Sequence, residues 1–255
     1  MTLAGFAILL ALVWIGMALS ILRYLPRRPA ATSLVILGAW VVYAGTMSWS
    51  GLTANTTMKP SPALFVALPP FLAAVIFLAL LPAGRRAALA FPLWLLLGGQ
   101  AFRVGVELVL HALWRDGLVP RLMTYEGGNV DIAIGLSAPV VAWLAMRNSG
   151  GRRLAQIWNV IGLAALANIV IRAALTAPGP LKLLDSDVPN LAIATFPYTY
   201  IAAFLAPLAL ALHILAIRAI AADRSRTTNA PQEKLPCTGS STEFRRPFSL
   251  PSSPL

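Results

Sequence analysis

The chain alternates long apolar runs with short polar or charged turns. A helix needs about 20 mostly apolar residues to cross a bilayer, and seven runs approach or reach that length. The predicted spans are residues 3–22, 32–52, 63–81, 91–114, 131–146, 154–175 and 198–221. The fifth run is the shortest, so its first residues are expected to lie among neighbouring helices. The pattern predicts an all-α, polytopic transmembrane helix bundle over residues 1–222.

The fourth span carries polar residues where a lipid-facing helix would be apolar. Four of them recur at helical spacing: Gln100, Arg103, Glu107 and His111. At 100° per residue they fall on one stripe roughly 80° wide. A lone charge at the bilayer centre costs about 2.5–3.5 kcal/mol, so the stripe must face protein or a water-filled cavity. This span is therefore expected to carry the functional site.

Composition agrees with a membrane protein and changes the interpretation of the charge. Of 255 residues, 58% are hydrophobic and 11% are charged, against about 25% charged in soluble domains. The mean hydropathy is +0.75. The net charge of +11 arises from short turns and the tail, where membrane topology accounts for it, so no nucleic-acid partner is predicted. The single cysteine, Cys237, excludes an intrachain disulfide.

Basic residues gather in the turns on one side of the predicted bundle. The turns after the first, third and fifth spans hold arginines and no acidic residue: Arg23, Arg27, Arg28, Arg85, Arg86, Arg147, Arg152 and Arg153. The other turns hold the acidic residues Asp116, Glu126, Asp185 and Asp187. The positive-inside rule then predicts an outside N-terminus and a cytoplasmic C-terminus. Residues 223–255, rich in Ser, Thr and Pro, are predicted to form a disordered cytoplasmic tail.

With this orientation, polar residues of several spans share a depth and predict a polar, charged pocket that opens outward. Its candidate residues are Gln100, Arg103, Glu107, His111, Glu126, Asn129, Asp131, Asn168, Arg172, Tyr198 and Tyr200. Asn159 lies about 180° from Asn168 on its helix and must face elsewhere. His213 is assigned to the inner half of the last span, at a different depth.

Two interpretations of the buried charges stay open. In one, Arg103 forms an ion pair with Glu107, one turn away on the same helix. In the other, Arg103 and Arg172 share an anionic group, and Glu107 and Asp131 orient them or move protons. Arg172 has no acid on its own helix, so it is expected to find one elsewhere: Glu107, Asp131 or an acid of the loop between spans six and seven.

Several familiar chemistries lack the residues that they need. Lysines occur only at positions 59, 182 and 234, outside every span, which excludes a retinal Schiff base. His111 and His213, at their predicted depths, cannot ligate one haem. The chain has no P-loop, no G-x-S-x-G and no H-E-x-x-H motif. No catalytic residue is assigned, and no cofactor or metal is predicted.

Four segments carry a resemblance to known sequences. They are QAFRVGVELVLHALWRDGLVPRLMTYEGGNVDIAIGLSAPVVAW, the later WNVIGLAALANIVIRAAL, Pro189-Asn190 and Phe196-Pro197. Together they resemble a family of uncharacterised bacterial multi-pass membrane proteins, over about residues 91–220. The family's spacing Glu-Gly-x-Asn-x-Asp is met between Glu126 and Asp131, and Tyr125 stands where the family often has Phe. The resemblance implies a protein of the bacterial inner membrane and adds no catalytic residue.

Two classes of function remain, and binding or transport of a small polar or anionic solute is favoured. It predicts that polar residues continue inward, as Gln100, Gln156, Asn159 and His213 do. The alternative is a membrane enzyme acting on a lipid-linked or phosphate-bearing substrate at the outer leaflet, which predicts a closed floor and a lateral opening to lipid. There Glu107 or Asp131 would be the acid or base, and arginines would hold the phosphate. The third option is a structural subunit of a membrane complex.

Overall fold

The computed structural model describes residues 2–58, 60–178 and 182–228, and every regular element in them is helical. The α-helices are α1 (Thr2–Tyr24), α2 (Arg27–Trp49), α3 (Pro62–Ala73), α4 (Pro82–Ala90), α5 (Leu93–Gly98), α6 (Phe102–Arg115), α7 (Asp131–Arg147), α8 (Ser149–Thr176) and α9 (Ala206–Thr228). Two π-helical segments, Ala74–Leu80 and Ile201–Leu205, extend α3 and precede α9. The predicted all-α class is confirmed.

Six helical segments within the described residues are long and apolar enough to cross a membrane. They are Leu3–Tyr24, Arg27–Trp49, Pro62–Leu80, Leu93–Arg115, Ser149–Thr176 and Ile201–Asp223. The fifth predicted span corresponds to α7, which has 17 residues and contains Pro139. The chain is thus a polytopic integral membrane protein built as a helix bundle.

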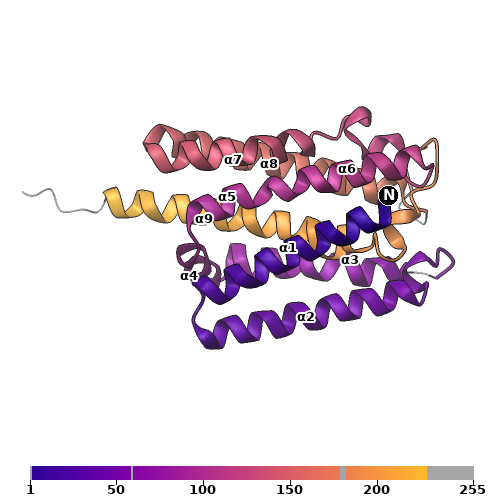
Figure 1. Ribbon diagram of the computed structural model, residues 1–255, viewed down its shortest axis with the longest axis horizontal. Helices are drawn as coiled ribbons and strands as arrows, with labels where there is room; N and C mark the ends of the chain where they lie inside the picture. The colour runs from indigo at the N-terminus through magenta and orange to yellow at the C-terminus, as the bar shows by residue number, and fades with distance from the viewer. Residues whose placement is uncertain (1, 59, 179–181, 229–255) are drawn as a thin grey trace, which may run out of the picture.

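The long helices run side by side along the longest dimension of the molecule, and α9 lies between α2–α3 and α7–α8 (Figure 1). Helix α9 packs against α4, α5, α8 and the π-helical end of α3. Half of the residues in its apolar segment are buried inside the protein, against 11% in α1. Helix α9 is therefore the centre of the bundle, and α1 is peripheral.

Two helices begin earlier than the hydrophobic pattern predicts. Helix α2 starts at Arg27 and α8 at Ser149, so the arginines assigned to those turns lie largely in first helical turns. The Asn148 side chain accepts a hydrogen bond from the Gly151 amide at 2.7 Å, which caps α8 directly after α7 ends. Helix α9 continues to Thr228, past Ala222, and the rest of the predicted tail lies outside the described residues.

Two consecutive prolines, Pro69 and Pro70, lie inside the third span. The helix starts at Pro62 and contains both prolines, and it changes to π-helical geometry at Ala74. Arg218 of α9 donates from Nη1 to the carbonyls of Leu78 at 2.7 Å and Ala79 at 2.6 Å. These bonds satisfy carbonyl groups that the end of the helix leaves without intrahelical partners.

Candidate functional site

Arg103 of α6 and Asp131, the first residue of α7, form a buried ion pair. The two residues are 2% and 8% exposed. Arg103 Nε donates to Asp131 Oδ2 at 3.2 Å, and Nη2 donates to Oδ1, so the guanidinium binds the carboxylate at two points. The amide groups at the start of α7 also favour a negative charge there. Arg103 therefore pairs across helices with Asp131, and the expected pair with Glu107 on its own helix is wrong.

The same guanidinium also contacts α9. Arg103 Nη1 lies 2.9 Å from His213 Nε2, and His213 Nδ1 lies 2.8 Å from Asn159 Oδ1 on α8. The Asn159 amide donates to the Ala155 carbonyl at 2.7 Å, so its oxygen must accept from Nδ1. His213 is then neutral, with its proton on Nδ1 and its Nε2 accepting from Arg103. Arg103 and His213 were assigned to different depths, and their side chains still make contact because a long arginine side chain reaches along its helix.

Close packing of α8 against α9 fixes the position of the imidazole. A Cβ atom built on Gly162 would lie 2.7 Å from His213 Nε2, so only glycine fits there with the ring in place. The Trp158 ring, one turn before Gly162 on α8, also packs against the imidazole, with ring centroids 5.6 Å apart. His213 and Asn159 have no exposed surface. The imidazole is thus held rigidly between Arg103 and Asn159.

Glu107 joins this cluster through Asn129, which lies in the loop before α7. Asn129 Nδ2 donates to Glu107 Oε1 and, at 3.3 Å, to the Met123 carbonyl. Asn129 Oδ1 accepts from the Asp131 amide at 3.2 Å. Glu107 Oε2 makes no hydrogen bond within the described residues. Glu107 is 1% exposed.

These contacts form one continuous chain of polar groups, which we call the buried network: Glu107, Asn129, Asp131, Arg103, His213 and Asn159. The network lies between two apolar clusters. On α9, His213 falls between Ala209 of one cluster and Leu215 of the other. Gln100 is also fully buried and donates to the Ala209 carbonyl at 3.0 Å, with its Oε1 lacking a partner among the described residues.

Arg172 takes no part in this network. Its Nε donates to Asn168 Oδ1 at 2.9 Å, and its Nη1 donates to the carbonyls of Leu122 at 3.1 Å and Gly127 at 2.6 Å. Gly128, with φ of 92°, lies beside the guanidinium. The prediction that Arg172 pairs with an acidic residue is therefore wrong, because backbone carbonyls of the α6–α7 loop accept its hydrogen bonds. Arg103 and Arg172 do not converge on one group.

The remaining predicted residues lie apart from the buried network. His111 stacks on Tyr125, with ring centroids 4.8 Å apart, and its Nδ1 is 3.8 Å from Glu126 Oε1. This group is half-exposed at the end of α6, one turn beyond Glu107. Tyr198 packs on Phe6, and Tyr200 donates to a carbonyl of α2. The two tyrosines thus stabilise the contacts of α1 and α2 with the start of the last span.

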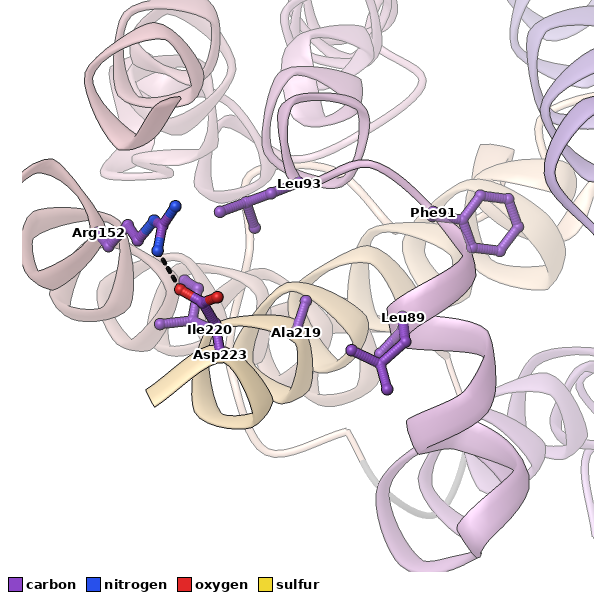
Figure 2. Close-up of a pocket in the computed structure, with 8 residues that line it drawn as sticks. Leu89, Phe91, Leu93, Arg152, Ala219, Ile220 and Asp223 are labelled. Carbon is purple, nitrogen blue, oxygen red and sulfur yellow. Dashed lines mark hydrogen bonds and ion pairs between the residues drawn. The ribbon is translucent and has the colours of Figure 1, made fainter. Parts of the chain in front are cut away.

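A small cavity of about 170 Å³ lies at the opposite end of the bundle from the α6–α7 loop (Figures 1 and 2). Its lining comes from α4, α8, α9 and the start of α5: Ala88, Leu89, Phe91, Leu93, Arg152, Ala219, Ile220 and Asp223. Arg152 and Asp223 form an ion pair at its edge (Figure 2). None of the predicted pocket residues lines this cavity.

The fold and the buried network define a class: a multi-pass membrane bundle with ionisable side chains linked in its interior. The chain belongs to the family defined by a domain of unknown function, DUF8737, whose profile matches residues 60–221. The matched segment contains the whole buried network and begins after α2. No curated protein and no solved structure matches the chain.

Proposed function

We propose that this protein binds or transports a small polar or anionic solute, with the buried network as its functional centre. The observation that carries the proposal is the unbroken chain of polar contacts through α6, α7, α8 and α9. Ionisable side chains inside membrane bundles commonly mark solute or ion pathways, because their desolvation is otherwise costly. The expected inward continuation of polar residues agrees with the contacts of Asn159 and His213.

Stability alone does not explain such a network. A buried ion pair is often neutral or unfavourable for stability compared with apolar residues of similar volume. The two apolar clusters already pack the bundle on both sides of Arg103. The network therefore serves a purpose that apolar packing would not, and exchange of a polar species is the purpose that fits its chemistry.

The route to solvent runs along α6 toward the α6–α7 loop. His111 lies one turn beyond Glu107 and contacts Glu126, whose side chain is 39% exposed. Polar groups thus extend from the interior to one surface, while an apolar cluster containing Trp158 and Leu215 lies on the other side of His213. This arrangement supports a site that opens at the α6–α7 end. Transport requires a second state in which the opposite side opens, whereas a floor that stays closed would favour the outer-leaflet enzyme.

Our proposal for topology is seven spans, with α7 as the fifth, an outside N-terminus and a cytoplasmic C-terminus, in the bacterial inner membrane. The one-sided distribution of arginines supports it. With this orientation the site opens to the periplasm. A reporter fused after Ala222 should be active in the cytoplasm, and activity only in the periplasm would overturn both the span count and the orientation.

Proteoliposomes containing the full-length protein test the function. The probes are radiolabelled phosphate, small carboxylates, amino acids and neutral sugars, each followed for saturable uptake. Wild-type protein should take up one class of solute, Arg103→Lys should reduce that uptake at least about tenfold, and Lys182→Gln, in an exposed loop, should not. Absence of uptake, together with absence of thermal stabilisation by every probe, would refute the proposal.

A further inference from the structure

The buried network contains one negative charge more than its cations can balance. Arg103 and Asp131 neutralise each other through two hydrogen bonds. His213 accepts from Arg103 and donates to Asn159, so it carries no charge. If Glu107 were ionised, its charge would remain uncompensated at 1% exposure. An uncompensated buried carboxylate costs several kcal/mol, so this charge must be removed or balanced.

The groups around Glu107 indicate how its charge is removed or balanced. The charged or titratable groups around it are Arg103 and His111, one turn away on either side in α6, Asp131 at the start of α7, and Tyr125 with Glu126 in the α6–α7 loop. His111 Nδ1 lies 3.8 Å from Glu126 Oε1, and His213 of α9 is reached only through Arg103. On the two other helices that pack against this region, Arg172 of α8 is bound to loop carbonyls, and α1 carries its arginine, Arg23, in its last turn. Of the two Glu107 oxygens, Oε1 accepts from Asn129, and Oε2 is buried without a partner.

We propose that Glu107 is a proton-binding site and holds its proton on Oε2 at neutral pH. The proposal deepens the proposed function, because it identifies a proton as the ion that would be exchanged together with the solute. A carboxylic acid removes the excess charge and still accepts the Asn129 hydrogen bond at Oε1. An unpaired neutral hydroxyl is far less costly than an unpaired charge.

A metal cation fits the same place less well. Within the described residues, no group of three or more His, Cys, Asp or Glu side chains is placed to hold a metal ion. The side-chain oxygen of Asn129, which is bonded to Glu107 through its amide nitrogen, already accepts from the Asp131 amide. A monovalent cation would need several oxygen ligands around Oε2, whereas a proton needs only that oxygen.

Proton exchange at Glu107 would act on the rest of the network through Arg103. Loss of the proton places a second carboxylate beside the Arg103–Asp131 pair, and both carboxylates then attract the same guanidinium. His213 would lose its donor if Arg103 moved toward Glu107. Release of one proton thus changes contacts on α7 and α9 together, which is the coupling that proton-driven solute exchange requires.

Infrared spectroscopy of the full-length protein at neutral pH tests the inference. Wild-type protein should show the carbonyl band of a protonated carboxylic acid, shifted in D₂O and shifted again by ¹³C-labelled glutamate. Glu107→Gln should abolish the band, and Asp185→Asn, at an exposed loop residue, should leave it intact. Glutamine matches the neutral acid in shape, so the melting temperature should change by less than about 3 °C.

Three outcomes would overturn the inference: no band in the wild type, a band that persists in Glu107→Gln, or a band that ¹³C-labelled aspartate shifts instead. If the variant fails to fold, isotope labelling of the wild type still separates a glutamic acid from an aspartic acid. Stabilisation by Na⁺ with no acid band would assign the site to sodium. Solute uptake without the band would refute the proton site and leave the proposed function standing. A band without uptake would support the proton site and refute the proposed function.

Discussion

Replacement of Arg103 by methionine is the most direct test of the buried network. Methionine keeps the unbranched shape of the side chain and removes the guanidinium. Asp131 then loses both hydrogen bonds from Arg103, and His213 Nε2 loses its donor. The change therefore leaves one buried carboxylate and one buried imidazole nitrogen without their partners.

The expected loss of stability in Arg103→Met is large, because solvent cannot replace the hydrogen bonds that Asp131 and His213 lose. The side chains of Arg103 and Asp131 are 3% and 11% exposed. Removal of one partner from a buried ion pair costs about 3–5 kcal/mol, a large part of a total stability of about 5–15 kcal/mol. For a protein of this size the melting temperature should fall by about 6–20 °C. Asp131→Asn should cost less, because Arg103 keeps its contact with His213.

Detergent melting curves and far-ultraviolet circular dichroism during SDS titration measure both quantities. The double variant Arg103→Met/Asp131→Asn should recover at least about 2 kcal/mol relative to the sum of the single losses. Arg152→Gln is the control, because its ion pair with Asp223 is nearly half-exposed and should contribute at most about 1 kcal/mol. Additive losses in the double variant would refute the interpretation of Arg103 and Asp131 as an energetic pair.

Two further predictions follow from the contacts of α8. Gly162→Ala places a methyl group against His213 and should destabilise the protein by about 1–3 kcal/mol in melting experiments. The control Gly38→Ala, with no atom within 4 Å of its Cβ, should be neutral or stabilising. Equal effects of the two variants would show that the imidazole has room to move. Arg172→Met should cost about 2–3 kcal/mol through its lost carbonyl contacts. Its effect should add to that of Asp131→Asn within about 0.5 kcal/mol, and a larger coupling would mean that the two residues share one site.

The polar face of α6 could be predicted because two simple rules act together there. Helical spacing places Gln100, Arg103 and Glu107 on one stripe, and the cost of charge in lipid turns that stripe inward. All three are at most 2% exposed. The same spacing argument separated Asn159 from Asn168, and the structure places the first in the buried network and the second beside Arg172.

The partners of the charges could not be predicted, because spacing along one helix gives a direction and not a distance between helices. Arg103 has an acid one turn away on α6, yet it binds Asp131, which presents both carboxylate oxygens from the start of α7. The reach of an arginine side chain is comparable with the helical pitch of about 5.4 Å. An arginine can therefore contact residues about one helical turn away from the depth of its own backbone. His213 was left out of the predicted pocket for that reason.

Arg172 shows a second source of error, the assumption that a cation in an apolar span requires an acid. Short 3-10 turns end at Met123 and Gly127, and such turns leave backbone carbonyls free to accept hydrogen bonds. Sequence alone cannot show that two such carbonyls point at one guanidinium, because their positions depend on how the α6–α7 loop folds over α8.

The α6–α7 loop is held from two sides, and this connects the surface of the protein to its interior. Arg172 of α8 donates to backbone carbonyls of the loop, and Asn129, a residue of the loop, donates to Glu107 in the interior. Asn129 also accepts from the first amide of α7, whose carboxylate Asp131 holds Arg103. A change of charge at Glu107 therefore acts on the loop and on the start of α7 through one amide side chain, while the Arg172 contacts, which involve no titrating acid, keep the loop attached to α8.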